Sequence, residues 1–276
     1  MNMKDVLRGK LTEDELKRVP RAFDVIGDVA IIEIPFELKK KRKLIAEALM
    51  KVNRHVKTVC DKYGERSGDY RLNSLEVIAG GSTLTEHREN GCRFRVDVVK
   101  AYFSPRESTE RVRIAKMIKP GEDVLVMFSG VCPSPVVYAK LQPGLHKAYG
   151  VELNPEAHKF ALENVRLNRM QTKVVPVLGN VKEVCPRIGI KFDRITMPLP
   201  KGAHEFLDTV FEVAKKGGIV HFYHYDREDD LYGKAVEYIE KAAEKAHKKV
   251  EILDKRKVLP YGPRIWKVCV EFRVLD

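Results

Sequence analysis

The sequence predicts an α/β protein with a mostly parallel, seven-stranded sheet, preceded by a smaller α+β unit. Three observations predict this fold. Residues 107–276 alternate strand-like apolar segments with helical segments. The last connection, 259–263 (LPYGP), is too short for a parallel crossover, so the final two strands should pair antiparallel. Residues 1–106 show a different pattern of predicted elements, with short strands and one long helix. We therefore expect two domains, 1–106 and 107–276.

The elements of the first domain follow from local patterns. Segment 23–34 (FDVIGDVAIIEI) is strand-like, with Gly27 and Asp28 as a turn or a bulge. Segment 37–56 is predicted to be a helix, because its apolar residues recur at helical spacing. The polar segment 62–70 is expected to be a loop. Short strands are expected at 56–60, 75–79, 84–88 and 92–98.

The second domain is read in the same way. Its strands are predicted at 123–128, 147–152, 173–178, 193–197, 218–224, 249–258 and 264–274. Helices are expected between them at 133–141, 155–168, 202–215 and 228–247. Five parallel strands followed by an antiparallel hairpin make up the Rossmann-like sheet of class I S-adenosylmethionine (SAM) methyltransferases. That fold is therefore expected by analogy, which by itself does not establish a function.

Charge and composition narrow the class of partner. The chain carries 51 Lys and Arg against 39 Asp and Glu, a formal net charge of +12. This favours a polyanionic partner, although a lysine-rich solubilising surface is the alternative. The basic run 39–43 (KKKRK) is either a solvated face or a phosphate contact. With 44% hydrophobic residues, the chain can form a sizeable core, which argues against disorder.

Other classes are excluded by what the sequence lacks. No segment approaches the roughly 20 apolar residues of a membrane helix, and the charged first 20 residues contain no signal-peptide core. We therefore expect a cytoplasmic protein with no membrane partner. The five cysteines are scattered singly with no C-x-x-C pair, which predicts neither a disulfide framework nor a zinc site.

Candidate ligand contacts lie where the predicted strands end. Ligands of doubly wound sheets bind beyond the carboxyl ends of the strands. The first strand runs into a small-residue turn (FSGVCP), where Gly130 would let the backbone approach a ligand closely. The second strand ends at Glu152, whose carboxylate can accept hydrogen bonds from both hydroxyls of a ribose. An ordinary strand-to-helix turn and a surface glutamate are the alternatives.

The next two strands end in further polar or rigid positions. Asn180 follows the third strand and could accept a hydrogen bond from an adenine amine. Pro198 and Pro200 follow the fourth strand and form a stiff loop that cannot continue the sheet. His221 and His224 lie on one predicted strand but face opposite sides, so they cannot jointly bind a metal ion.

Several motifs together carry a family resemblance. They include YFSPRESTERVRIAKMI, MFSGVCP, GVELNPEA, DRITMPLPKGAHEFL, GGIVHFYHY and LPYGPRIWKVCVEFRV. In this order and spacing, over residues 20–276, they resemble archaeal and eukaryotic tRNA (guanine-37-N1)-methyltransferases. The related wybutosine-pathway enzyme, which transfers an aminocarboxypropyl group from SAM to tRNA, belongs to the same superfamily. The resemblance implies SAM as cofactor and the anticodon stem-loop of tRNA as partner, gripped by the basic first domain.

The resemblance also implies residue roles. Glu110 matches the proposed general base on guanine N1, while a helix-start glutamate favouring the helix dipole is the alternative. Pro198 and Pro200 match the loop beside the target base. Cofactor contacts are implied for Tyr102, Ser104, Arg111, Phe128, Gly130, Glu152, Leu153, Asn180 and Val181. Neither a metal ion nor an obligate protein partner is implied.

Some positions depart from the family pattern. Pro198 stands where asparagine is usual, and Asn73 stands where arginine is usual, although Arg71 is near. Cys132 and Asn180 replace a common glycine and aspartate. No counterpart of the separate N-terminal domain of many archaeal members is expected, a trait shared with the aminocarboxypropyl transferase. Three hypotheses stay open: N1 methylation of guanine 37, aminocarboxypropyl transfer to the tricyclic wybutosine precursor base, and a non-catalytic SAM- or tRNA-binding relative.

Overall fold

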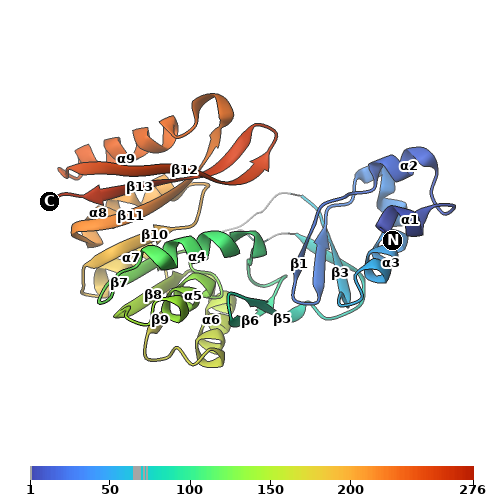
Figure 1. Cartoon of the computed structure of the whole chain (residues 1–276), viewed down its shortest axis with the longest axis horizontal. Helices are drawn as coiled ribbons and strands as arrows, with labels where there is room; N and C mark the ends of the chain where they lie inside the picture. The colour runs from blue at the N-terminus through green and yellow to red at the C-terminus, as the bar shows by residue number, and fades with distance from the viewer. Residues whose placement is uncertain (1, 65–69, 71, 73) are drawn as a thin grey trace. The chain divides into compact units, whose positions relative to one another are not determined.

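A computed structural model describes residues 2–64, 70, 72 and 74–276 of the chain (Figure 1). The chain forms two compact units, Met1–Pro105 and Arg106–Asp276, and each has its own apolar core. Residues 65–69 of the expected loop, and the positions Arg71 and Asn73, lie outside the described residues.

The first unit contains a four-stranded sheet in the order β1-β2-β3-β4, and a separate hairpin of β5 and β6. The bounds are β1 (Phe23–Ile26), β2 (Val29–Ile32), β3 (Thr58–Lys62), β4 (Leu75–Ala79), β5 (Leu84–Glu89) and β6 (Cys92–Asp97). Strands β1 and β2 pair antiparallel on either side of Gly27 and Asp28. These two residues therefore form a turn rather than a bulge. Strand β2 pairs parallel with β3, which pairs antiparallel with β4.

Helices cover this sheet, and two of them were not predicted. The helical segments are α1 (Met3–Leu7), α2 (Glu13–Arg18), η1 (Phe36–Lys41) and α3 (Arg42–Val52). Both α1 and α2 begin with a capping box, in which Asn2 pairs with Asp5 and Thr12 with Glu15. These short helices carry too few apolar positions to produce a periodic signal, but their caps are visible in the sequence.

The helix predicted at 37–56 is shorter and less regular than expected. It starts as the 3-10 turn η1 and ends at Val52, where Asn53 leaves the helical conformation and donates from Nδ2 to the Leu49 carbonyl at 3.0 Å. The basic run is largely paired within this unit. Its ion pairs are Lys39–Asp61, Lys41–Glu15 and Arg42–Glu76. The other two members of the run, Lys40 and Lys43, are exposed and form no ion pair with another described residue.

The second unit is a seven-stranded sheet in the order β12-β13-β11-β10-β7-β8-β9 (Figure 1). The bounds are β7 (Asp123–Met127), β8 (Lys147–Glu152), β9 (Val174–Leu178), β10 (Phe192–Met197), β11 (Ala214–Arg227), β12 (Val250–Gly262) and β13 (Ile265–Val274). Strands β7 to β11 pair parallel, while β13 pairs antiparallel with both β11 and β12. The predicted α/β sheet and its terminal antiparallel hairpin are confirmed.

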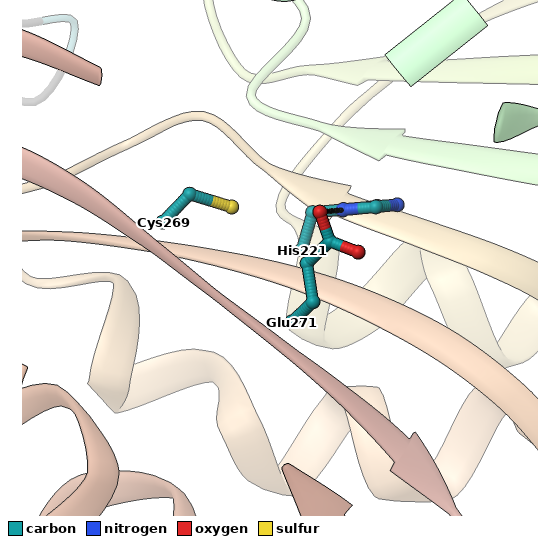
Figure 2. Close-up of side chains that lie close together, drawn as sticks. All are labelled: His221, Cys269 and Glu271. Atoms are coloured by element: carbon teal, nitrogen blue, oxygen red, sulfur yellow. Dashed lines mark ion pairs between the residues drawn. The ribbon is translucent and has the colours of Figure 1, made fainter. Parts of the chain in front are cut away.

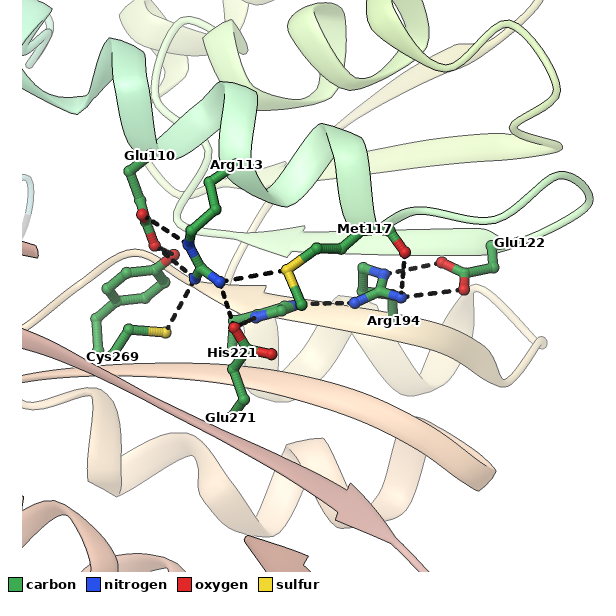
Figure 3. Close-up of polar contacts among 9 residues, drawn as sticks. Glu110, Arg113, Met117, Glu122, Arg194, His221, Cys269 and Glu271 are labelled. Atoms are coloured by element: carbon green, nitrogen blue, oxygen red, sulfur yellow. Dashed lines mark hydrogen bonds and ion pairs between the residues drawn. The ribbon is translucent and has the colours of Figure 1, made fainter. Parts of the chain in front are cut away.

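Helices form a layer on each face of this sheet (Figures 1 and 3). One layer contains α4 (Ser108–Met117), α5 (Pro133–Leu141) and α6 (Pro155–Leu167), with the 3-10 turn η2 (Pro105–Glu107) just before α4. The other contains α7 (Val181–Arg187), α8 (Leu207–Val213) and α9 (Gly233–Lys245), with the 3-10 turns η3 (Ala203–Phe206) and η4 (Glu228–Asp230) before α8 and α9.

Three local predictions in this unit need correction. Helix α7 was not predicted, although Asn180 caps it through its side chain. The helix expected at 202–215 starts as η3 and ends at Val213, and β11 begins at once with Ala214. The helix expected from residue 228 begins only at Gly233, because Tyr232 has a φ of 75°, which a right-handed helix cannot contain.

One apolar core cluster of the second unit lies between the sheet and the layer of α7, α8 and α9. Helices α4, α5 and α6 bury further apolar residues in the other layer. All five cysteines are buried free thiols. Burial raises the pKa of Cys60 to about 11 and that of Cys132 to about 12.

No helix among the described residues is long and apolar enough to span a membrane.

Candidate active site

Backbone hydrogen bonds hold the carboxyl ends of three neighbouring strands together. The Ser129 N–H donates to the Val151 carbonyl at 2.8 Å, which ties the end of β7 to β8. The Gly179 N–H donates to the Glu152 carbonyl at 2.9 Å, which ties the end of β9 to β8. The predicted contacts that follow these strands therefore lie along one edge of the sheet, as the ligand-binding rule for doubly wound sheets requires.

The turn after β7 has an unusual backbone. Phe128, Gly130 and Cys132 all have positive φ values, of 59°, 56° and 69°. Glycine adopts this conformation readily, whereas the other two residues do so at a cost of roughly 1–2 kcal/mol each. A Cβ on Gly150 of β8 would lie 2.8 Å from Cys132 Sγ, so the turn packs directly onto the neighbouring strand. Strain held in place by such packing is common at ligand sites.

Glu152 connects this turn to the end of β8. Its Oε2 accepts a hydrogen bond from the Gly130 N–H at 2.7 Å, and its Oε1 accepts one from the Asn154 N–H at 2.8 Å. Burial raises the pKa of Glu152, and the backbone hydrogen bonds only partly oppose this. Each carboxylate oxygen retains a lone pair for a ligand hydroxyl. The neighbouring Leu153 is exposed, with 43% of its surface accessible.

Asn180 and Val181 begin helix α7. Asn180 Oδ1 accepts a hydrogen bond from the Lys182 N–H at 3.0 Å and so caps the helix. An amide oxygen has two lone pairs, so the predicted contact with an adenine amine would use the second one. Val181 is buried in the core, which leaves its backbone rather than its side chain to face a ligand.

The proline loop follows β10. Pro198 and Pro200 are half-buried, and between them the Leu199 N–H donates to the Met197 carbonyl at 2.8 Å. In the turn η3 that comes next, Phe206 packs edge-on against Phe128, with ring centroids 4.9 Å apart. The segment after β10 therefore contacts the turn after β7, next to Gly130 and Glu152.

Glu110 lies in the first turn of α4 and is buried, with 8% of its surface exposed. Arg113 donates from Nε to Oε2 at 2.9 Å and from Nη2 to Oε1 at 2.7 Å, and the Tyr223 hydroxyl donates to Oε1 at 2.6 Å. Burial acts to raise the pKa of Glu110, but the hydrogen bonds from Arg113 and Tyr223 outweigh it and lower that pKa. Glu110 is therefore an ionised carboxylate with a fixed orientation. Arg111, the next residue, is also buried.

A continuous polar network extends from Glu110 under helix α4 (Figure 3). Arg113 also donates from Nη1 to Glu271 on β13, and His221 Nδ1 lies 3.5 Å from that carboxylate. Arg194 of β10 contacts His221 Nε2 at 2.9 Å. Because a guanidinium only donates, Nε2 must accept, and the proton of the neutral imidazole sits on Nδ1, facing Glu271.

Arg194 forms the far end of this network. It is 1% exposed and donates from Nε to Glu122 Oε2 at 2.8 Å and from Nη2 to the Met117 carbonyl at 2.8 Å. It thereby ties β10 to the end of α4. Such a buried cation requires both a counter-ion and full hydrogen bonding.

His221, Cys269 and Glu271 place three metal-type ligand atoms within 4.8 Å of one another (Figure 2). The Arg113 guanidinium contacts two of these side chains, lying 3.6 Å from Cys269 Sγ. The positive charge that such a donor set would take from a metal ion is therefore supplied by Arg113. His224 faces the other side of the sheet, where it packs against Tyr238, so the two histidines do not converge.

Two predicted contacts belong to the first unit. Tyr102 is 37% exposed and Ser104 is half-buried, near the C-terminal end of that unit, and their role stays a prediction. Three residues around Glu110 were not predicted from the sequence: Arg113, Tyr223 and Glu271. Arg113 had a detectable signal, because a residue three positions after a glutamate lies on the same helix face. The other two come from strands more than 100 positions away.

Comparisons with known proteins identify the family. Residues 85–253 match the TRM5/TYW2 methyltransferase domain, and residues 3–83 match the TYW2 N-terminal domain. The tRNA (guanine(37)-N(1))-methyltransferase Trm5b of Pyrococcus abyssi is 44% identical over 94% of this chain and 77% of its own length. The tRNA(Phe) (4-demethylwyosine(37)-C(7)) aminocarboxypropyltransferase of Pyrococcus horikoshii is 32% identical over 99% and 96%.

Solved structures agree. The complex of aTrm5 with tRNALeu superposes with a TM-score of 0.87 at 33% identity, covering all of this chain and 78% of that one. Methanocaldococcus jannaschii TYW2 in complex with AdoMet superposes with a TM-score of 0.70 at 27% identity, covering 92% of this chain and 100% of that one. The resemblance stated from the motifs is thus confirmed, and the chain belongs to the TRM5/TYW2 methyltransferase family.

Proposed function

We propose that the chain is a SAM-dependent tRNA methyltransferase that methylates N1 of guanine 37, next to the anticodon. The observation that carries this proposal is the 44% identity to the Pyrococcus abyssi guanine-37 N1-methyltransferase, together with an oriented carboxylate at Glu110. The identity to the aminocarboxypropyltransferase is lower, at 32%.

The edge formed by β7, β8 and β9 fits SAM. Glu152 presents two oxygens with free lone pairs to ribose hydroxyls, and the Phe128–Cys132 turn brings backbone close to them. Leu153, Asn180 and Val181 would contact the adenosine, and Arg111, Tyr102 and Ser104 the remainder of the cofactor. SAM supplies an activated methyl group on a sulfonium sulfur.

Glu110 supplies the base. The N1 proton of guanine must leave as the methyl group arrives, and a positioned carboxylate typically contributes about 10²–10⁴ to such a step. Pro198 and Pro200 would form the wall that holds the target base, because fixed φ angles make this loop stiff. Holding both reactants in line supplies much of the remaining acceleration.

The anticodon stem-loop of tRNA is the proposed partner. Support comes from the tRNA complex of the related aTrm5 and from the net charge of +12. We assign phosphate contacts to the first unit (domain 1–106) and catalysis to the second (domain 107–276). Within the first unit, Arg88, Arg95, His55 and His87 line an open hollow of about 720 Å³, where Asp28 and Glu86 also lie. We propose a cytoplasmic location, where tRNA is modified.

Aminocarboxypropyl transfer is the second candidate. It is favoured by one observation, the match of residues 3–83 to the TYW2 N-terminal domain. In that reaction SAM would be held with its carbon chain, rather than its methyl group, facing the nucleophile.

Doubly labelled SAM distinguishes the candidates. The enzyme is incubated with unmodified tRNA transcripts and with SAM labelled separately in the methyl and carboxyl groups. We expect only methyl label in tRNA, lost when guanine 37 is replaced. Carboxyl label, tested also on tRNA carrying the wybutosine precursor, would establish the second candidate. Neither label, with tRNA binding retained, would show a non-catalytic relative.

A further inference from the structure

The surroundings of Glu110 raise a question that its role as a base does not answer. A base must take up a proton, yet Glu110 forms a two-pronged ion pair with Arg113, which weakens it as a proton acceptor. Taking the proton would also remove the negative charge that balances Arg113, whose side chain is only 15% exposed. An unbalanced buried cation is costly. Some other group must therefore balance Arg113 during the reaction.

Glu271 is placed to do this. It is 2% exposed and accepts a hydrogen bond from Arg113 Nη1, on the opposite side of the guanidinium from Glu110 (Figure 3). Burial acts to raise the pKa of Glu271, but the adjacent His221 ring, 3.5 Å away, and the hydrogen bond from Arg113 hold that pKa far below its usual range. Glu271 thus stays ionised whether or not Glu110 carries a proton.

The charge of the whole network agrees with this arrangement. The linked side chains of Figure 3 include the carboxylates Glu110, Glu271 and Glu122 and the guanidiniums Arg113 and Arg194. Burial lowers the pKa of His221, so this imidazole is neutral. The network therefore holds one surplus negative charge when Glu110 is ionised, and none after Glu110 takes up a proton. This surplus negative charge opposes the lowering of the Glu110 pKa by Arg113 and favours proton uptake by Glu110.

We propose that Arg113 and Glu271 are positioning residues for the base: Arg113 orients Glu110, and Glu271 neutralises Arg113 once Glu110 has taken the N1 proton. This inference rests on the proposed function. The hydrogen bonds also select the atom that reacts. Among the described residues, Oε1 accepts from Arg113 and Tyr223, whereas Oε2 accepts from Arg113 alone, so Oε2 has the lone pair for the proton.

The step balances. The N1–H bond of guanine breaks and an O–H bond forms at Oε2 of Glu110. N1 keeps the electron pair, bonds to the methyl carbon, and displaces the sulfur, which leaves with the electron pair of the broken C–S bond. Arg113 remains paired with Glu271 throughout.

Several charged or titratable groups act on Glu110 besides Arg113. They come from every element packed around it: Tyr138 on α5, Tyr223 on β11, Arg256 on β12, and Cys269 and Glu271 on β13. Tyr223 and Cys269 are protonated, because burial raises the pKa of both. Among these groups, Arg113 is the cation that contacts Glu110 directly, so its replacement should dominate any change in pH dependence.

Two replacements test the proposal because their expected effects differ in kind. Single-turnover methyl transfer to tRNA is measured against pH, with the affinities for SAM and tRNA measured separately. In Arg113→Met, the main opposition to the effect of burial is lost, so the pKa of Glu110 rises even though Tyr223 and Arg256 still act to lower it. The loss is then largest at low pH, is partly recovered as the pH rises, and displaces the rate–pH curve upward by about one unit or more. Arg113→Lys keeps the charge and should give a smaller displacement.

In Glu271→Gln, the positive charge of Arg113 is no longer shared with a second carboxylate. Arg113 therefore interacts more strongly with Glu110 and makes Glu110 a weaker base. We expect a loss of about tenfold that shows no upward displacement of the curve, with both affinities unchanged. The matched control is Glu251→Gln, which removes an exposed ion pair with Arg273 on the same hairpin and should leave rate and curve unchanged.

The outcomes separate this inference from the proposed function. Wild-type curves in both Arg113→Met and Glu271→Gln, or equal losses without displacement in both, would overturn the positioning role even if methylation is confirmed. Full activity of Glu110→Gln, or no methyl transfer by the wild type, would instead overturn the proposed base or function. If Arg113→Met fails to fold, Arg113→Lys and the near-isosteric Glu271→Gln carry the test.

Discussion

Glu110 and Glu152 are both carboxylates set into the interior of the second unit, yet their pKa values move in opposite directions. Glu110 is surrounded by charged and hydroxyl side chains, with Arg113 on both of its oxygens. Glu152 is held by backbone N–H groups, with Gly130 donating to one oxygen and Asn154 to the other. Burial opposes ionisation at both sites.

The difference shows that the partner, more than the depth of burial, sets the charge of a carboxylate. A guanidinium offers a full charge and two donors in a fixed geometry. Backbone amides offer dipoles, which form hydrogen bonds to the carboxylate oxygens but only partly offset the free-energy cost of desolvation. One site therefore holds an ionised, oriented carboxylate that can take a proton from the reacting guanine, and the other is suited to accept hydrogen bonds from neutral ligand hydroxyls.

The largest effect is expected at Glu110. Glu110→Gln keeps the size of the side chain but removes the base, so single-turnover methyl transfer should fall by about 10²–10⁴. The affinity for SAM, measured by calorimetry, should be unchanged, because we propose that Glu152, and not Glu110, binds the cofactor. A rate close to wild type would end the assignment of Glu110 as the base.

The far end of the Glu110 network should affect stability. Arg194→Met leaves Glu122 without its buried partner and His221 without a donor, and should lower the free energy of unfolding by about 3–5 kcal/mol. Urea denaturation measures this. The double variant Arg194→Met/Glu122→Gln should recover part of the loss, and equal losses in both variants would show that the ion pair is not its source.

Glu152 provides the opposite test to Glu110, because its replacement should weaken SAM binding. Glu152→Gln replaces one acceptor oxygen by a donor, and should weaken SAM binding about tenfold, corresponding to the loss of about 1.5 kcal/mol for one charge-assisted hydrogen bond. Calorimetry provides the measurement. Glu240→Gln, on the exposed face of α9, is the control and should bind SAM like the wild type. Unchanged affinity in Glu152→Gln would remove this residue from the cofactor site.

The smallest expected effect is on the pH dependence of SAM binding. The pKa of Glu152 is raised, so lowering the pH protonates it earlier than an ordinary glutamate, and the protonated form loses an acceptor. The affinity for SAM should therefore fall about threefold as the pH drops from about 7.5 to about 5.5. In Glu152→Gln this part of the pH dependence should vanish. A wild-type profile that stays flat would contradict the raised pKa.

The fold was largely predictable because its signals are local. The apolar runs ending at Met127 and Glu152 identify strands, and the short 259–263 connection requires an antiparallel final pair. Helix α7 was missed because its seven residues include Pro186, which disguises a helical pattern. The end of α3 was misplaced because Asn53 breaks the helix through its own side chain.

The candidate site was predictable only where it follows strand ends. Glu152 and Gly130 could be proposed from position alone, because strand tips meet at one sheet edge. Glu110 came from the family resemblance, and its partners Tyr223 and Glu271 could not be found from spacing. Their contacts with α4 depend on how β11 and β13 pair, and a one-residue shift in that register would turn both side chains to the opposite face.

The burial of every cysteine has a practical consequence for chemical labelling. Thiolates, not thiols, react with iodoacetamide and with peroxide, and Cys60 and Cys132 have raised pKa values of about 11 and 12 behind closed packing. A cysteine of this chain can therefore be modified only after the segment around it opens. The order in which individual cysteines acquire an alkyl tag would report which parts of the chain open first on warming.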